Sequence, residues 1–325
     1  MSFSLAAIDA IAGPVFPDNA TLVPLYEGGS FTEGVAAGHD GNVYFLDVTP
    51  TARPGGALGY VMKFDPRKGA TTLFRSPSGG ANGMKFDHEG RMVLALGADC
   101  GARAVIRTDL VSGKSELVAG LYGGKPFNSP NDLAIDKAGR IYVTDPRYIG
   151  HESLEQPVYG VYRIDPDQSV RLILPGVQKP NGVAVSPDGT TLYVAEHNIV
   201  GNDIVNLPKG SVLKYGPMRL LAFSLNEHGE AGAARALVDY GDRDGPDGLL
   251  TDESGNVYVA ERKDPDFGIA VYRPDGTRLD FIRTPAKPTN LGFGRGVEAG
   301  RLYITAGKGL YSVETAQRGW DAASR

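Results

Sequence analysis

The segment NDLAIDKAGRIYVTD, from Asn131 to Asp145, contains the pattern that decides the fold. It combines a short apolar run, a turn that ends in Gly, and a second run rich in β-branched and aromatic residues. Short runs of this kind, separated by Gly and Asp, are typical of two antiparallel strands joined by a tight turn. The segment therefore predicts a β-hairpin that opens on a carboxamide side chain.

The same phrase occurs six times along the chain. The other copies begin at Glu33, Asn82, Asn181 and Asp247, and a looser copy begins at Asn290. Successive copies start 49, 49, 50, 66 and 43 residues apart. This spacing is typical of the blades of a β-propeller and too long for short solenoid repeats.

Two further strand-like runs follow most copies and complete a four-stranded blade. Third strands are expected near 60–64, 104–108, 160–164, 220–224, 269–273 and 309–313, and fourth strands near 71–75, 115–119, 170–174, 235–240 and 279–284. The sixth blade has no fourth run, whereas residues 21–26 resemble one and precede the first copy. We therefore predict an all-β, six-bladed β-propeller closed by an N-terminal strand, because this pairing removes an exposed sheet edge.

Composition and charge limit the partners and the compartment. We expect one domain over residues 1–325, with an N-terminal arm (1–19), a propeller (20–313) and a C-terminal tail (314–325). The net charge of −5 without a basic stripe argues against nucleic acid or an anionic membrane as the main partner. Cys100 is the single cysteine, and no signal peptide or membrane-spanning apolar run is visible, so we expect a cytoplasmic protein.

The repeat predicts a metal site. First strands of a propeller line its channel, so the opening residues of the six copies should lie together at one end. All six carry a carboxylate or a carboxamide: Glu33, Asn82, Asn131, Asn181, Asp247 and Asn290. Converging oxygen donors suit a hard divalent cation. Turn chemistry alone would explain any one Asn-Gly or Asp-Gly pair, but it would not require an oxygen donor in all six copies.

The loops between second and third strands should open beside this site. They carry four arginines that could neutralise an anionic or polyhydroxylated substrate: Arg53, Arg103, Arg147 and Arg262. We consider Arg103, Arg147, His151 and His197 candidate substrate contacts, together with Asn82 and Asn290 in the channel. The alternative for the loop arginines and histidines is that they are solvated and have no role. The 66-residue spacing after Asn181 comes mainly from residues 197–219, which we expect to form a lid or an oligomer contact.

At these residues the chain resembles the senescence marker protein / gluconolactonase / luciferin-regenerating enzyme family, and most of all the bacterial gluconolactonases. The motifs are FTEG at 31–34, NSPNDLAID at 128–136, IYVTDPRY at 141–148, KPNGVAVSPDGTTLYVAE at 179–196 and PDGLLTDESGNVYVAE at 246–261. The family consists of six-bladed propellers and includes sugar-acid lactonases. The resemblance therefore implies a lactonase.

The resemblance also implies roles for individual residues. Glu33, Asn181 and Asp247 match the family's metal ligands, and Asn131 matches a residue that binds metal in some members and substrate or water in others. Asp247 matches the base that activates water, so we expect Asp247 and Asn131 to be catalytic. Ser129 replaces an Arg of the mammalian sugar lactonases, and the Cys100 loop lacks the His of many bacterial gluconolactonases. Both departures fall on substrate-facing positions.

The expected protein is thus a metal-dependent hydrolase that opens a gluconolactone-like sugar lactone by attack of metal-activated water. Its expected cofactor is one divalent ion, Ca²⁺ before Zn²⁺, Mn²⁺, Mg²⁺ or Fe²⁺, and its expected assembly is a monomer or a dimer. Two alternatives stay open. One is a phosphotriester or fluorophosphate hydrolase, and the other is a non-catalytic propeller that binds calcium or a partner.

Overall fold

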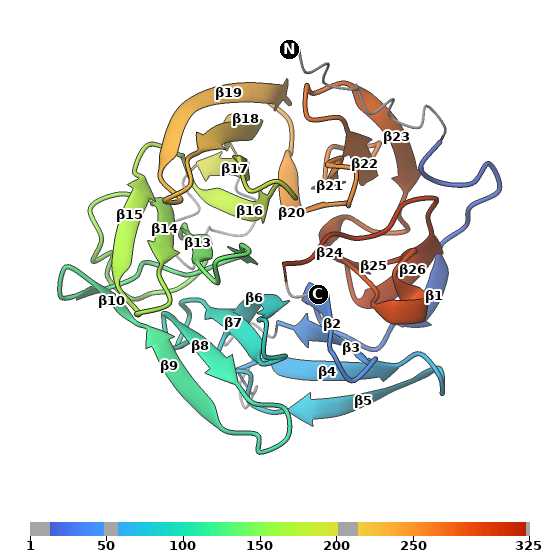
Figure 1. Ribbon diagram of the computed structural model, residues 1–325, viewed down its shortest axis with the longest axis horizontal. Helices are drawn as coiled ribbons and strands as arrows, with labels where there is room; N and C mark the ends of the chain where they lie inside the picture. The colour runs from blue at the N-terminus through green and yellow to red at the C-terminus, as the bar shows by residue number, and fades with distance from the viewer. Residues whose placement is uncertain (1–13, 49–57, 201–213, 323–325) are drawn as a thin grey trace, which may run out of the picture.

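Six four-stranded antiparallel sheets surround a central channel in the computed structural model (Figure 1). The structure describes residues 14–48, 58–200 and 214–322, so residues 1–13 of the expected N-terminal arm lie outside it. The predicted all-β, six-bladed propeller is confirmed. Within the described residues no helix is long and apolar enough to cross a membrane.

The first three blades follow the order of the chain. Blade one contains β2 (Thr32–Ala37), β3 (Val43–Asp47), β4 (Tyr60–Asp65) and β5 (Ala70–Arg75). Blade two contains β6 (Ala81–Phe86), β7 (Met92–Leu96), β8 (Ala104–Thr108) and β9 (Ser115–Ala119). A small hairpin, β10 (Leu121–Tyr122) and β11 (Lys125–Pro126), precedes blade three, which contains β12 (Leu133–Ile135), β13 (Ile141–Asp145), β14 (Gly160–Ile164) and β15 (Val170–Leu174).

The remaining blades complete the ring. Blade four contains β16 (Pro180–Val185), β17 (Thr191–Val200), β18 (Lys214–Leu225) and β19 (Ala231–Asp239). Blade five contains β20 (Pro246–Thr251), β21 (Val257–Glu261), β22 (Gly268–Tyr272) and β23 (Arg278–Arg283). Blade six contains β24 (Pro288–Phe293), β25 (Arg301–Ala306), β26 (Gly309–Glu314) and β1 (Val23–Tyr26), with a 3₁₀ turn at Gly296–Glu298.

Strand β1 closes the ring, as predicted. It pairs antiparallel with β26, with Val23 opposite Ser312, and Figure 1 shows the blue first strand beside the red last blade. This pairing covers the edge that β26 would otherwise expose. The ring is therefore held at one blade by segments from both ends of the described chain.

A buried tyrosine fastens the first hairpin of several blades. The Tyr142 hydroxyl donates to Asp136 at 3.1 Å, and the Tyr258 hydroxyl donates to Asp252 at 3.2 Å. Both tyrosines are fully buried, and a buried hydroxyl without a partner would destabilise the fold. The Asp and Tyr of the repeated phrase therefore stabilise the hairpins that carry Asn131 and Asp247.

The glycine that follows four of the six predicted donors allows neighbouring inner strands to approach closely. A Cβ atom on Gly182 would lie 2.3 Å from the carbonyl oxygen of Asp247, and one on Gly34 would lie 2.5 Å from that of Asn82. Neither glycine has the positive φ that a left-handed turn position requires. Contact between blades, rather than a turn, accounts for these glycines, so turn chemistry does not explain the donors that precede them.

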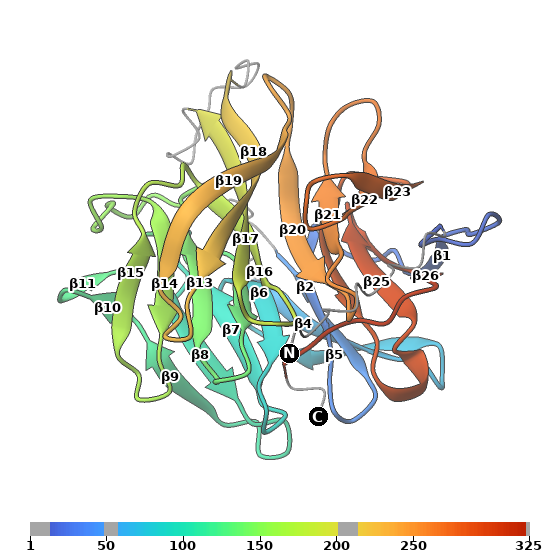
Figure 2. The same ribbon diagram turned by 45° about the horizontal axis from the view of Figure 1, so that its top comes forward.

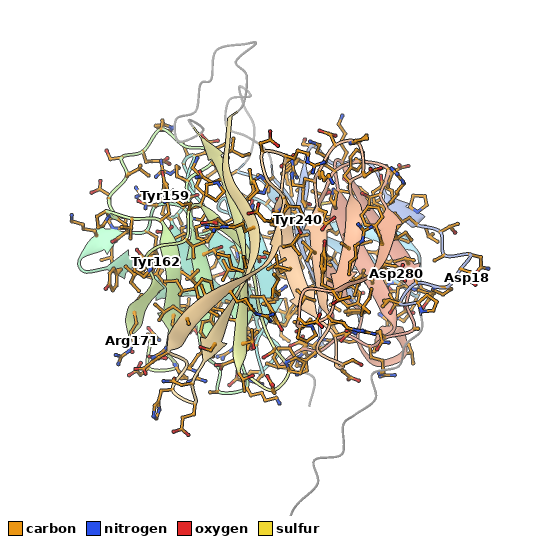
Figure 3. The ribbon with its side chains drawn as sticks, turned by 90° about the horizontal axis from the view of Figure 1, so that it is seen from above. Asp18, Tyr159, Tyr162, Arg171, Tyr240 and Asp280 are labelled. Atoms are coloured by element: carbon orange, nitrogen blue, oxygen red, sulfur yellow. The ribbon has the colours of Figure 1, made fainter. Side chains whose placement is uncertain are left out.

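Blade four is taller than the others. Residues 197–200 and 214–219 were expected to be part of a loop insertion, but they extend β17 and β18. Figures 2 and 3 show these two strands projecting beyond the rest of the ring on one face. The remainder of the insertion, residues 201–213, lies outside the described residues. The strand ladder thus replaces a loop beside the predicted metal site.

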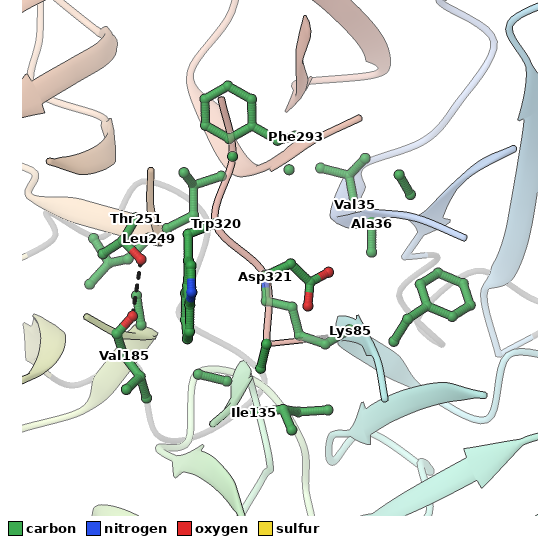
Figure 4. Close-up of a pocket in the computed structure, with 18 of the residues that line it drawn as sticks. Val35, Ala36, Lys85, Ile135, Val185, Leu249, Thr251, Phe293, Trp320 and Asp321 are labelled. Atoms are coloured by element: carbon green, nitrogen blue, oxygen red, sulfur yellow. Dashed lines mark hydrogen bonds between the residues drawn. The ribbon is translucent and has the colours of Figure 1, made fainter. Parts of the chain in front are cut away.

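The C-terminal segment covers the other end of the channel. Trp320 and Asp321 lie between the last residues of the inner strands, as Figure 4 shows, and line a small cavity of about 90 Å³. The backbone N–H of Trp320 donates to the Thr251 carbonyl at 3.2 Å, and Arg295 forms an ion pair with Asp321. The expected polar tail is therefore packed onto the ring up to these residues.

Candidate functional site

A cavity of about 330 Å³ opens at the end of the channel where the inner strands begin. Five of the six predicted oxygen donors line it: Glu33, Asn82, Asn131, Asn181 and Asp247. The sixth, Asn290, is buried deeper and does not line the cavity; its amide nitrogen lies 3.4 Å from Asp132 Oδ2. The repeat therefore brings five donors from five blades to one cavity.

Three buried carboxylates line this cavity, Glu33, Asp99 and Asp247, and two of them are predicted donors. Glu33 and Asp247 are 5% and 6% exposed. Burial raises the pKa of Glu33 well above its ordinary value, and the charge of Asp247 raises it further. Burial also raises the pKa of Asp247. Burial, and for Glu33 also repulsion by Asp247, therefore disfavours the ionised forms, and a bound cation would favour them.

Asn131 presents an acceptor with no partner. Its backbone N–H donates to the Thr144 carbonyl at 2.9 Å, and its own carbonyl accepts from the Asn82 amide at 3.4 Å. Its side-chain Oδ1 is buried and has no hydrogen-bond partner among the residues that the structure describes. Buried polar atoms are nearly always paired. An oxygen-seeking cation such as Ca²⁺ or Mg²⁺ therefore fits this set of donors.

Arg262 brings a positive charge to the same place. One of its guanidinium nitrogens donates to Asp247 Oδ2 at 3.0 Å and to the Pro288 carbonyl at 3.3 Å. Its side chain is only 19% exposed, so this ion pair is little screened by water. Arg262 lies on the connection after β21 and was expected as a loop arginine that could neutralise substrate, but its pairing with Asp247 was not predicted. Arg53, another of the expected loop arginines, lies outside the described residues.

His197 lies in β17 and is buried, unlike the solvated loop histidine considered from the sequence. Its Nδ1 is 2.8 Å from the Pro246 carbonyl, and its Nε2 is 3.3 Å from Asp244. Asp244 also contacts Lys287 Nζ at 2.8 Å. Although burial acts to raise the pKa of Asp244, its neighbours His197, Arg262 and Lys287 together hold it below the ordinary value. His197 is thus fixed in the cavity wall by two partners.

Most of the chain matches one known protein family. Residues 31–200 and 215–308, well over half of the chain, match the SMP-30/gluconolactonase/LRE-like region. The chain belongs to this family. The matched residues include all six donor positions of the repeat, from Glu33 to Asn290.

Two curated relatives and one solved structure illustrate the similarity. A gluconolactonase of Zymomonas mobilis is 34% identical over 250 residues, which are 74% of this chain and 64% of that protein. Lactonase drp35 of Staphylococcus epidermidis is 26% identical over 250 residues, which are 73% of this chain and 65% of that protein. The chain thus spans just under two thirds of the length of these relatives. A gluconolactonase structure from Xanthomonas campestris superposes with a TM-score of 0.76 at 26% identity, covering 94% of this chain and 92% of that one.

In this member of the SMP-30/gluconolactonase/LRE-like family, Asp132 is a buried carboxylate that was not predicted from the sequence. It is 1% exposed, and its Oδ1 accepts the backbone N–H of Leu133 at 2.8 Å. Burial raises its pKa. The sequence did contain an indication of this residue. Asp132 occupies the repeat position where four other copies have glycine: Gly34, Gly83, Gly182 and Gly248.

Tyr148 is a second residue that was missed. Its hydroxyl lies 3.0 Å from the Lys179 carbonyl and 3.1 Å from the His197 carbonyl, so it joins blades three and four at the cavity wall. It ends the motif IYVTDPRY, which had served only to support the family resemblance. The repeated phrase could not indicate Tyr148, because this residue lies in the loop after β13.

Three predicted substrate contacts lie outside the cavity. Arg147 is fully buried and donates to the backbone carbonyls of Asn128 and Glu152 at 2.8 and 2.7 Å, so it stabilises the loop instead of meeting a ligand. Arg103 donates to the Phe127 carbonyl at 2.6 Å. His151 is exposed and lies near Cys100 and Glu152 on the outside of the same loops. Both arginines donate to backbone carbonyls instead of facing the cavity. The sequence gives no indication of such partners, because every residue has a carbonyl.

Proposed function

We propose that the chain is a metal-dependent hydrolase that opens a lactone ring. Family membership and the names of the relatives, gluconolactonase and lactonase, support this proposal. One structural observation carries it. Two buried carboxylates, Glu33 and Asp247, share one cavity with Asn131 Oδ1, which has no hydrogen-bond partner in the described part of the chain. A sugar lactone such as gluconolactone is the first substrate to test because relatives carry that name.

The proposed metal ligands are Glu33, Asn131, Asn181 and Asp247. All four offer oxygen atoms, which favours Ca²⁺ as the resident ion, with Mg²⁺, Mn²⁺, Zn²⁺ and Fe²⁺ as alternatives to test. A bound divalent ion supplies Lewis-acid polarisation of the ring carbonyl. The two carboxylates would balance its charge, and Arg262 would remain paired on the other side of Asp247.

In this proposal Asp247 is the general base. It accepts a proton from the water that attacks the carbonyl carbon, and it returns a proton to the ring oxygen as the acyl carbon–oxygen bond breaks. Burial makes this carboxylate more basic than an exposed one, while the Arg262 guanidinium favours its ionised form. Asn131 and Asn181 orient the water and the carbonyl from the neighbouring blades.

The test is lactone hydrolysis by protein from which metal has been removed. The protein is treated with a chelator, dialysed and assayed by pH-stat on five- and six-membered lactones, with a phosphotriester as a separate arm. We expect turnover to disappear and to return when one of the five divalent ions is added. Tight metal binding without hydrolysis of any lactone would instead support a non-catalytic propeller, and hydrolysis of the phosphotriester alone would support the other alternative.

A further inference from the structure

Among the residues that the structure describes, the more exposed side chains lining the cavity are mostly apolar, although its floor is polar. Phe31 and Ile149 are 37% and 41% exposed, whereas the carboxylates of the floor are almost fully buried. Leu58, Val48 and Ile199 line the same cavity from blades one and four and are half-buried. Among the described residues, aliphatic and aromatic side chains therefore come from three blades to the part of the cavity nearest the solvent.

Several polar side chains of the wall are already engaged with the protein, including Asp99, whose Oδ1 lies 3.9 Å from His151 Nδ1. The Ser78 hydroxyl donates to the Leu58 carbonyl at 2.7 Å. The Ser129 hydroxyl accepts the backbone N–H of Ala98 at 2.9 Å. Tyr148 and His197 also line the wall, and their polar atoms contact backbone carbonyls and Asp244, as described above. These groups are held in place by bonds that a ligand hydroxyl would have to share or replace.

We propose that the preferred substrate is a lactone whose ring carries an apolar substituent, rather than the fully hydroxylated ring of a sugar lactone. This inference rests on the proposed lactonase function and narrows its substrate. A ring hydroxyl beside this wall would lose its water and gain few partners, which disfavours binding. An alkyl substituent in the same place would bury apolar surface against Phe31, Leu58 and Ile149.

The size of the cavity agrees with a small substituted ring. Its volume of about 330 Å³ is near the lower end of small-molecule sites. The polar floor would take the ester group, because the cation that Glu33, Asn131 and Asp247 would hold is the group that polarises an ester carbonyl. The substituent would then point toward the mouth.

The first experiment compares three lactones with the same six-membered ring: D-glucono-δ-lactone, unsubstituted δ-valerolactone and δ-decalactone, which carries a pentyl chain. For each, kcat/KM is divided by the rate of spontaneous hydrolysis. We expect δ-decalactone to exceed δ-valerolactone at least tenfold and to exceed gluconolactone as well. Gluconolactone as the best of the three would overturn the inference. Failure of all three would instead contradict the proposed lactonase function.

The second experiment assigns the preference to the mouth. Ile149→Asn places an amide in the apolar rim and should lower the ratio of kcat/KM for δ-decalactone to that for δ-valerolactone at least fivefold. Leu154→Asn is the matched control, because Leu154 is 47% exposed on the same connection between β13 and β14 but does not line the cavity. An unchanged ratio in Ile149→Asn, or an equal change in both variants, would overturn the assignment.

Discussion

Individual residues set the charge of the proposed metal centre. Glu33 and Asp247 come from the repeated phrase and were predicted, because the repeat places its opening residues at the same end of the channel. Asp244 was not predicted, and Arg262 was expected to meet substrate and not to pair with Asp247, because both lie on connections where no repeat constrains their partners. The sequence thus predicted which oxygen donors meet, but not which positive charges balance them.

Arg262 should weaken cation binding. Arg262→Gln removes a positive charge beside the donors and frees Asp247 Oδ2 from its 3.0 Å contact. Both effects favour a bound divalent ion, so we expect Ca²⁺ to bind about tenfold more tightly, or about 1.4 kcal/mol. Isothermal titration of metal-free protein measures this. Arg243→Gln is the control, because it removes the same charge from an exposed position nearby. Weaker Ca²⁺ binding in Arg262→Gln would contradict the role assigned to Arg262.

Asp244 should stabilise the fold in a pH-dependent way. Asp244→Asn leaves His197, Arg262 and Lys287 without their shared carboxylate, and we expect a loss of about 3 kcal/mol in the free energy of unfolding at pH 7. Because the folded state holds the pKa of Asp244 below its ordinary value, this stabilisation is present above about pH 4 and is lost as the pH falls further.

Urea unfolding of wild type and Asp244→Asn at pH 7 and pH 3 tests this prediction. The difference between the two proteins should shrink at pH 3. Asp266→Asn serves as the control because Asp266 pairs with Arg283 on the surface, where an ion pair contributes little. A difference of the same size at both pH values would show that the charge of Asp244 is not the cause.

At the scale of strands, most boundaries could be predicted because each strand is a short apolar run between turn residues. Strands β8, β9, β14 and β15 have the expected bounds. The extension of β17 and β18 could not be predicted, because residues 197–200 and 214–219 mix polar and apolar side chains. In addition, the two extensions that pair with each other are separated by an insertion in the sequence. The twelve-residue β18 is formed by pairing rather than by its own pattern.

The close contact between inner strands gives a prediction at this scale. Gly182→Ala would place a Cβ atom 2.3 Å from the Asp247 carbonyl oxygen, so blades four and five would have to separate. We expect a loss of about 1–3 kcal/mol in the free energy of unfolding. Gly176→Ala is the control, because a Cβ atom there meets nothing within 4 Å and its φ is not positive. Equal stability of the two variants in denaturant titrations would contradict the packing role of Gly182.

At the scale of the molecule, ring closure was predictable and the covering of the channel was not. The count of strand-like runs showed that blade six lacked a fourth strand and that residues 21–26 could supply it. No pattern in residues 314–322 indicated that Trp320 would lie at the end of the channel, because its partners are inner strands of several blades.

Deletion of residues 1–26 should open the ring. Without β1, the backbone donors and acceptors along one edge of β26 would be exposed and would pair with a second molecule. We expect a lower melting temperature and self-association, measured by thermal unfolding and by size-exclusion chromatography with light scattering. A monomer that melts at the temperature of the full chain would contradict the role of β1 in closing the ring.

The central claim is that Asp247 activates water in a metal-bound site. It is tested most directly by kcat/KM of Asp247→Asn for the best lactone, measured with saturating divalent metal. The exposed Asp167→Asn, which makes the same chemical change in the turn before β15, is the control. A folded Asp247→Asn protein should lose at least a hundredfold, the usual contribution of a general base, while the control keeps its activity. Hydrolysis by Asp247→Asn at the wild-type rate would contradict the account.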